Sequence, residues 1–383
     1  MSAIYNDSLN EYCRKYFVKD EVKITQQDVL LAEWRYKKLQ AELFESFLLN
    51  EKVNLKVYGE NIPLVFLINN LGLQNVEKLL ERDALSFTLW TPMIVQMVDN
   101  IEGVVPIAAG RVNSAVHSDP VESIKSGFNW MRNGINEKTK KMLTNKVRDL
   151  YVLPQDNLEH DASALTLSAF HSNKTSLIGF NSEGLDIHKL NKEQKTKITE
   201  CASTILEHKF LISQNLVSND VSKFSRLYSD SINKIVKSEV KDFSAKIFEL
   251  ECFPDLYTLG MNIENPLQHL IKIRHSKNSV KFRSWVQEFS NTTDINEISK
   301  AYMDEITRPI GFLQSDEGRF VKSCLMTTIG AGVGAFCGPA GALVGAGAGL
   351  AIDLIDEFFI SELTKGWTPR MFFDDMRNFA KTI

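Results

Sequence analysis

The sequence has few cysteines, and they do not form the closely spaced pairs of a disulfide scaffold. Five occur in 383 residues, an odd number at wide spacing. This usage is typical of a reducing compartment. The first residues also lack the apolar core that follows a basic segment in a secretory signal peptide. We therefore expect a protein that is made and folded in the cytoplasm, even if part of it later meets a membrane. The cysteines are Cys13, Cys201, Cys252, Cys324 and Cys337.

An excess of charge of either sign is also missing. The formal net charge is -4 at pH 7, so the chain has no general basic field and we do not expect nucleic-acid binding. Hydrophobic residues make up 44% of the chain and charged residues 24%, which are ordinary values for a globular protein. The length is sufficient for two domains, or for one large helical domain with a tail.

Motifs of catalytic and metal sites are absent as well. The sequence contains no G-x-S-x-G, no H-E-x-x-H and no Walker A motif. None of the seven histidines has a His or Cys three or four residues away, as a zinc site would. His160-Asp161 and His171 come nearest to a hydrolytic or metal pair, but solvated loop residues are the favoured interpretation. We expect no enzymatic activity, no cofactor and no metal.

Hydrophobic periodicity predicts a mainly α protein with a small β element near the N-terminus. Residues 26–49 have helical spacing. Residues 50–95 are predicted to form a strand–helix–helix–strand module. Its strands are expected at 53–57 and 85–89, and its helices at 63–71 and 74–80, hinged at Gly72.

The rest of the chain alternates between helical and irregular patterns. Residues 100–118 are loop-like, helices are expected at 120–132 and 136–151, and 191–289 are almost wholly helical. We expect four consecutive parts. They are an N-terminal α+β module (1–151), an irregular connector (152–190), a helical domain (191–317) and a glycine-zipper hairpin with an aromatic amphipathic tail (318–383).

One predicted helix carries a basic cluster interleaved with aromatic residues. Such a cluster can hold phosphate or an acidic partner. The favoured interpretation is a solvated basic face above an apolar core face. The cluster consists of Arg274, His275, Lys277, Lys281 and Arg283.

The segment from Cys324 to Ile352 is unlike any other part of the chain. Its 29 residues carry no charge, and they include eight glycines and seven alanines. Glycines recur every fourth residue in two stripes, and this spacing favours close packing of helices, chiefly in membranes. Gly338-Pro339 divides the segment into two arms. The residues expected to carry helix packing or membrane contact are Gly330, Gly334, Gly338, Pro339, Gly341, Gly345 and Gly349.

Three interpretations of this segment compete. A nucleotide loop is disfavoured, because too few residues follow for a βαβ unit and no Gly-Lys-Ser/Thr is present. A buried structural hairpin and a membrane-active hairpin remain equally supported. Eight helical glycines cost about 8 kcal/mol relative to alanine, against a total stability of about 5–15 kcal/mol. The segment must therefore pack closely against something.

Geometry limits the membrane interpretation. The arms contain 14 and 13 residues, and at about 1.5 Å per residue each reaches only about 20 Å. A hydrocarbon core of about 30 Å needs about 20 residues in a spanning helix. We therefore expect a re-entrant hairpin, or one that inserts after oligomerisation or release, rather than a constitutive two-span anchor.

The tail after this segment is strongly aromatic. Trp367, Phe372, Phe373 and Phe379 have the character of residues at a membrane interface. Docking of the tail onto the protein's own core is the favoured interpretation of the same pattern. The two interpretations make opposite predictions for the burial of these rings.

The glycine stripes resemble the glycine-zipper stretches of bacterial pore-forming and membrane-associated proteins. The resemblance covers about 30 residues and is one of motif only. It implies a membrane-associating or membrane-permeabilising effector of the toxin or host-defence type, held in the cytoplasm and peripheral to or inserting into the inner membrane. Membrane lipid, another copy of the chain and a protein partner are the partners to expect. A soluble helical interaction or scaffold protein, with the hairpin as a buried staple, is the alternative.

Overall fold

A computed structural model describes most of the first 289 residues and a few of the tail. The described residues are 3–18, 23–89, 94–98, 101, 104–154, 158–178, 180–214, 216–218, 256–289, 371–372, 375–376 and 378–379. Of the described residues, 67% are helical and 10% lie in strands, which confirms a mainly α protein. None of the helices in these ranges is both long and apolar enough to cross a membrane.

The chain divides into two compact units, each built from two stretches of sequence. Unit 1 contains Met1–Ala32 and Lys52–Lys241, and unit 2 contains Glu33–Glu51 and Asp242–Ile383. The four parts expected from the sequence are consecutive stretches, whereas both units are discontinuous. The discontinuity arises because residues 33–51 belong with the C-terminal half of the chain.

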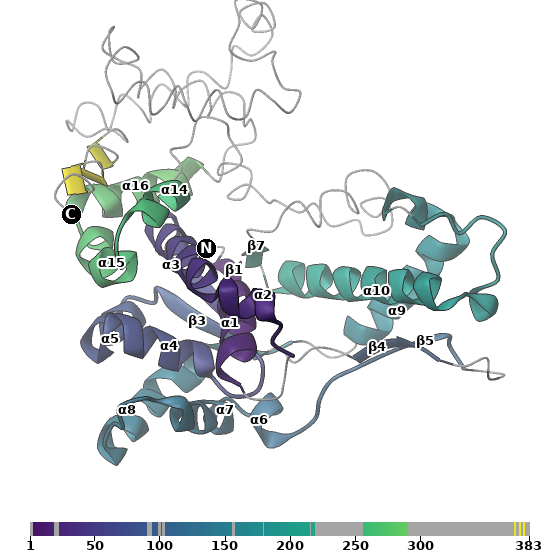
Figure 1. Cartoon of the computed structure of the whole chain (residues 1–383), viewed down its shortest axis with the longest axis horizontal. Helices are drawn as coiled ribbons and strands as arrows, with labels where there is room; N and C mark the ends of the chain where they lie inside the picture. The colour runs from purple at the N-terminus through teal and green to yellow at the C-terminus, as the bar shows by residue number, and fades with distance from the viewer. Residues whose placement is uncertain are drawn as a thin grey trace, which may run out of the picture. The chain divides into compact units, whose positions relative to one another are not determined.

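Unit 1 is organised by a five-stranded sheet in which every pairing is parallel. Its strand order is β6-β3-β2-β1-β7. Figure 1 labels β3, β1 and β7 of this sheet. The predicted strand–helix–helix–strand module is present as β2, α4, α5 and β3. Gly72 separates its helices with a φ of 81°, a value that favours glycine. The bounds are β1 Ala3–Asn6, β2 Val53–Val57, α4 Ile62–Leu71, α5 Leu73–Glu81, β3 Leu85–Leu89, β6 Tyr151–Val152 and β7 Leu216–Ser218.

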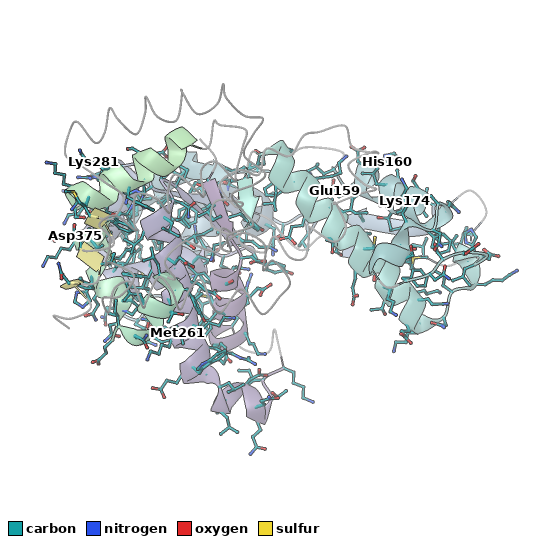
Figure 2. The ribbon with its side chains drawn as sticks, turned by 90° about the horizontal axis from the view of Figure 1, so that it is seen from above. Glu159, His160, Lys174, Met261, Lys281 and Asp375 are labelled. Carbon is teal, nitrogen blue, oxygen red and sulfur yellow. The ribbon has the colours of Figure 1, made fainter. Side chains whose placement is uncertain are left out.

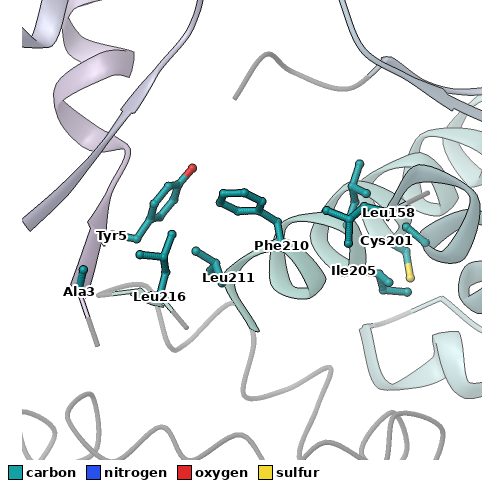
Figure 3. Close-up of a cluster of buried hydrophobic side chains, with 10 residues drawn as sticks. Ala3, Tyr5, Leu158, Cys201, Ile205, Phe210, Leu211 and Leu216 are labelled. Atoms are coloured by element: carbon teal, nitrogen blue, oxygen red, sulfur yellow. The ribbon is translucent and has the colours of Figure 1, made fainter. Parts of the chain in front are cut away.

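Helices α9 (Leu158–His171) and α10 (Lys192–Ser213) lie between β6 and β7 in the chain. The chain steps in one direction from β1 to β6 and then crosses back to β7. Because parallel crossovers are right-handed, the returning helices lie on the opposite face from the others. Ala3 and Tyr5 of β1 belong to one apolar cluster with Ile205 and Phe210 of α10, in which the Tyr5 and Phe210 ring centroids lie 6.4 Å apart (Figure 3).

A second apolar cluster joins the other halves of α9 and α10 to an antiparallel ribbon. The ribbon consists of β4 (Ile94–Met97) and β5 (Ile107–Gly110). Ile107 of β5 packs with Phe170 of α9 and Ile198 of α10. Two 3-10 helices, η3 (Lys174–Ile178) and η4 (Ile187–Lys189), complete this part of unit 1.

Several short helices with clear sequence signals also belong to the described part of unit 1. Asp119 caps α7 by accepting a hydrogen bond from the Val121 amide at 2.8 Å, and Pro120 is the first helical residue. Thr25 and Asp28 form a reciprocal capping box at the start of α2. The bounds are α1 Ser8–Phe17, α2 Gln26–Leu30, α6 Ala115–Ser118, α7 Pro120–Gly127, η1 Phe128–Trp130, α8 Glu137–Val147 and η2 Arg148–Leu150.

Three expectations about regular structure were wrong. The predicted helix 26–49 is interrupted at Leu31, between α2 and α3. The stretch 100–118, expected to be a loop, contains β5 and α6, because Ile107 finds an apolar core in α9 and α10. The connector 152–190, expected to be irregular, contains the 14-residue helix α9.

The described part of unit 2 is helical. Its elements there are α3 (Ala32–Leu49, whose first residue belongs to unit 1), α14 (Leu256–Asn262), α15 (Pro266–Arg274) and α16 (Lys277–Phe289). Gly260 lets α14 approach α3 closely. A Cβ at this position would lie 3.1 Å from the Cα of Ala41. The glycine-rich segment 324–352 lies outside the described residues.

Candidate functional sites: a tail dock and a polar sheet face

Three residues of the C-terminal tail form an apolar stripe that packs on unit 2. Phe372, Met376 and Phe379 are spaced i, i+4 and i+7, so they share one face of a helix. Phe372 and Met376 are buried, with exposed fractions of 0% and 2%. The Phe372 ring stacks on Phe282 of α16 with centroids 4.4 Å apart. The Phe379 ring meets His269 of α15 at 5.0 Å in a T-shaped contact. We call this surface of α15 and α16 the tail dock.

The other side of the tail is polar. Met371 is 39% exposed, and the Asp375 side chain is exposed. Asn278 of α16 donates a hydrogen bond to Oδ2 of Asp375 at 2.9 Å. Figure 2 labels Asp375 on the tail and Lys281 on α16 at the same end of unit 2. An apolar stripe with a polar rim is the usual pattern of a helix bound in a groove.

Only part of the predicted site can be placed. Phe372 and Phe379 pack on the tail dock, while Trp367 and Phe373 lie outside the described residues. The residues predicted for helix packing, Gly330, Gly334, Gly338, Pro339, Gly341, Gly345 and Gly349, also lie outside them. Their role stays a prediction.

A buried arginine of α15, Arg274, joins the dock to the end of α3. The Arg274 side chain is 2% exposed, and it donates hydrogen bonds to the carbonyls of Phe47, Asn50 and Glu51. The last carbonyls of a helix have no partner within it, and they form the negative end of the helix dipole. A cation from α15 therefore caps α3.

Arg283 of α16 extends the same network. It is 4% exposed, donates to the Arg274 carbonyl at 2.9 Å and to Ser279 Oγ at 2.8 Å, and pairs with Glu51 at 3.3 Å. The expectation that this basic cluster is a solvated face is therefore wrong for its two arginines. Lys277 on the same helix is exposed, as expected. The sequence could not show this difference, because the partner carbonyls are more than 200 residues away.

Unit 1 carries a second unusual feature, a polar face on the central strands of its sheet. In the strand register Asn54 pairs with Tyr5 on one side and with Ser86 on the other, and Lys56 pairs with Thr88. Because alternate residues of a strand point to the same face, these five side chains lie on one face of the sheet. Central parallel strands are normally apolar on both faces. Only the opposite face of β2 and β3 follows that rule, with Val53, Leu55, Val57, Leu85, Phe87 and Leu89 all buried.

Three of these polar side chains form a hydrogen-bonded network centred on Asn54. Asn54 Nδ2 donates to Ser86 Oγ at 3.0 Å, and Thr88 Oγ1 donates to Asn54 Oδ1 at 2.6 Å. All three residues are buried. Buried polar groups are tolerated when they are hydrogen-bonded, and such networks help to specify a single arrangement of the core.

At the carboxyl end of β1 and β2 the polar face carries a phenol, an ammonium and a carboxylate. Lys56 Nζ lies 3.6 Å from Glu207 Oε1 of α10. Burial, and then the charge of Glu207, raise the pKa of Tyr5 well above its usual value. In Figure 3 the Tyr5 hydroxyl points away from Ala3 and Leu216. Open parallel sheets bind ligands beyond the carboxyl ends of their strands. At neutral pH Tyr5 can serve there as a hydrogen-bond donor, but it is not a nucleophile.

The loop after β2 is held by side chains from distant parts of unit 1. The Arg14 guanidinium hydrogen-bonds the Tyr58 carbonyl and the Glu60 carboxylate, and lies 4.5 Å from the centre of the Tyr58 ring. Gly59 has a φ of 70°, and a Cβ there would lie 2.9 Å from His117 Nε2. Sequence reasoning missed this cluster because only the glycine after a predicted strand hints at it.

The candidate histidine pair does not form a site. His160 and His171 lie at opposite ends of α9, about 16 Å apart at 1.5 Å per residue. Asp161 pairs instead with Lys209, at 2.9 Å. His171 and Glu183 both line a cavity of about 370 Å³. Within the described ranges, no three His, Cys, Asp or Glu side chains group as metal ligands.

Two cysteines of unit 1 are unreactive by environment. Cys13 and Cys201 are both buried. Burial raises the pKa of Cys201 to about 12, and it raises that of Cys13 further. Because the thiolate is the reactive form, neither is a nucleophile at neutral pH.

No family model, curated protein or solved structure matches this chain. The function therefore has to be argued from the residues and contacts described above.

Proposed function

We propose that this protein is a membrane-associating effector that acts through the segment 324–352 as a hairpin anchored to unit 2. The observation that supports the proposal is the tail dock. Helix α16 ends at Phe289, and Phe372 packs on Phe282 of the same helix. The uncharged segment lies between these two points in the sequence.

The two anchor points favour a hairpin over a single crossing. Because both flanks of the segment join the same compact unit, both lie on the same side of any bilayer that the segment meets. A re-entrant hairpin satisfies this condition, whereas one kinked spanning helix would place its ends on opposite sides. The arms, each about 20 Å long, agree with partial rather than full crossing.

Glycine and alanine provide little transfer free energy, so one hairpin alone is a weak membrane anchor. Close packing of glycine stripes between copies offsets this weakness through van der Waals contact. We propose that permeabilisation requires several copies, at the cytoplasmic side of the inner membrane.

Leakage of dye from liposomes tests the proposal. Wild-type protein is expected to release dye. Gly334→Leu with Gly345→Leu is expected to abolish release, because two leucines fill the stripes. The matched control is Gly332→Leu with Gly347→Leu, which makes the same chemical change about 160° away around each helix, and it is expected to retain release.

The outcomes separate the two candidate functions. The membrane proposal fails if wild-type protein neither binds liposomes by flotation nor releases dye. The alternative is a soluble interaction or scaffold protein with the segment as a buried staple. It is supported if the Gly334→Leu/Gly345→Leu protein also unfolds, as measured by circular dichroism. Relief of toxicity on expression after deletion of 324–352 provides an independent test in cells.

A further inference from the structure

Helix α2 turns its polar residue inward and its apolar residues outward. Its one buried residue is Asp28, with an exposed fraction of 5%, whereas Val29 and Leu30 are 65% and 77% exposed. Among the described residues, no other large hydrophobic side chain is as exposed as these two. An ordinary surface helix has the opposite arrangement, with its apolar side toward the core.

Polar contacts to α1 hold α2 in this orientation. Lys15 pairs with Oδ1 of Asp28 at 2.6 Å, and Tyr16 donates a hydrogen bond to the Asp28 carbonyl oxygen at 3.1 Å. The capping box between Thr25 and Asp28 fixes the first turn. Leu30 lies about 160° around the helix from Asp28, so anchoring Asp28 on α1 directs Leu30 outward.

The exposed apolar residues belong to one projecting turn. Ile24, which is 45% exposed, precedes the N-cap residue, and Val29 is the fourth residue of the helix. These are the two positions of a hydrophobic staple, and Leu30 follows Val29 directly. We call Ile24, Val29 and Leu30 the α2 patch. Every residue from Lys23 to Leu30 except Asp28 is exposed, so the patch does not line a groove.

Size and shape favour a lipid surface over a protein partner. Three partly exposed aliphatic side chains present at most a few hundred Å². A stable protein interface buries about 800 Å² on each partner. An apolar turn needs no complementary pocket to enter the boundary between headgroups and acyl chains. Of the exposed flanking side chains, Gln26 and Gln27 can hydrogen-bond headgroups, and Lys23 can extend to a phosphate.

We infer that the α2 patch is a membrane contact, and that its partner is the interfacial region of a lipid bilayer. The contact goes beyond the proposed hairpin, because it involves none of the residues 324–352. Binding through three aliphatic side chains is weak and reversible, so the patch positions unit 1 at a bilayer rather than anchoring it.

An environment-sensitive fluorophore tests this contact. The full chain carries Leu30→Cys labelled with NBD, the buried Cys13 and Cys201 are kept, and the remaining three cysteines are changed to serine. With phosphatidylcholine liposomes, the NBD fluorescence is expected to rise severalfold and to shift to the blue. The control carries the same label at Lys138→Cys, an exposed position of α8, and is expected to change little.

Flotation with the same liposomes measures what the patch contributes to binding. Val29→Ser with Leu30→Ser is expected to lower the partition coefficient about tenfold or more, because two aliphatic side chains no longer leave water. Gln26→Ser with Gln27→Ser is the matched control, since it changes two exposed residues of the same helix. This control should bind as the wild type does.

The inference is overturned if the label at position 30 does not respond to liposomes, whether or not the protein floats. It is also overturned if the two double variants lose binding equally. A label that is already in an apolar environment without lipid would show that another part of the chain, or a second copy, covers the patch.

Dye leakage is recorded in the same samples, which separates this contact from the proposed function. Leakage without a response at position 30 contradicts the α2 contact alone. A response at position 30 without leakage contradicts permeabilisation alone.

Discussion

The guanidinium of Arg274 lies 2.7 Å from the carbonyl oxygen of Asn50, although 224 residues separate them in the chain. Through this contact a residue of α15, in the C-terminal half of the chain, caps α3, which lies in the N-terminal half. Its partners are carbonyls at and just beyond the end of α3, which no residue within α3 can satisfy.

Replacing Arg274 by methionine is expected to destabilise α3. Loss of the guanidinium leaves several buried carbonyls without a donor, at about 1–3 kcal/mol for each unsatisfied group. We expect the free energy of opening of α3, measured by hydrogen exchange with mass spectrometry, to fall by about 2–5 kcal/mol. Lys272→Met, on an exposed position of the same helix, is the control and should change it by less than about 0.5 kcal/mol. Equal exchange in both variants would contradict the capping role.

Gly59→Ala is expected to destabilise unit 1 partly through a steric clash that Gly72→Ala lacks. Both glycines have positive φ, so both substitutions strain the backbone, and Gly72, with a ψ of 151°, lies close to a region that is essentially restricted to glycine. Only at Gly59 does the new Cβ also meet a ring, 2.9 Å from His117 Nε2, whereas no atom lies within 4 Å at Gly72. Urea unfolding measures both. Adding His117→Ala should recover the steric part of the loss at Gly59, and no recovery would exclude the ring as its cause.

The buried network of the sheet predicts strong coupling between Asn54 and Thr88. Asn54→Ala leaves the Thr88 and Ser86 hydroxyls without a partner, and Thr88→Val leaves Asn54 Oδ1 without its donor. Each is expected to cost about 1–3 kcal/mol. The double variant should cost less than the sum of the two, with a coupling of about 1 kcal/mol or more. Additive losses in urea unfolding would mean that the hydrogen bond does not stabilise the fold.

The stability of unit 1 is expected to fall at alkaline pH through Cys201. Burial raises the pKa of this thiol to about 12 in the folded protein, whereas an unfolded thiol titrates near pH 8.5. Between these values the unfolded chain loses a proton that the folded chain keeps, so stability falls as pH rises. The slope from this group is up to about 1.4 kcal/mol per pH unit. Urea unfolding of Cys201→Ala should show a shallower decline above pH 8.5, and parallel curves would refute this.

Local patterns predicted the parts of the fold that local interactions determine. The module from β2 to β3 has two alternating runs and a glycine hinge, all within 40 residues, and these local patterns predict it. Strand β6 has two residues and β7 has three. No periodicity exists over such lengths, and their parallel partners are far away in sequence. The all-parallel sheet could not be predicted for that reason.

In the candidate sites, too, the sequence predicts what depends on neighbouring residues and not what depends on distant ones. The spacing of Phe372, Met376 and Phe379 is visible in the sequence, and it shows that one side of the tail is apolar. The sequence does not show what the tail binds, because Phe282 becomes its partner only through tertiary packing. The arginines of the dock were misjudged for a related reason: a charged residue is usually solvated, unless distant carbonyls surround it.

The distance in sequence between Arg274 and Glu51 also determines how long after its own synthesis α3 can receive its cap. At about 5–20 residues per second, the 223 residues between them take a ribosome roughly 11–45 s to translate. The last strand of the unit 1 sheet ends at Ser218, so this sheet can close while α15 is still unmade. Helix α3 lies within the first 50 residues, so the carbonyls at its end lack the Arg274 donor until α15 has been synthesised.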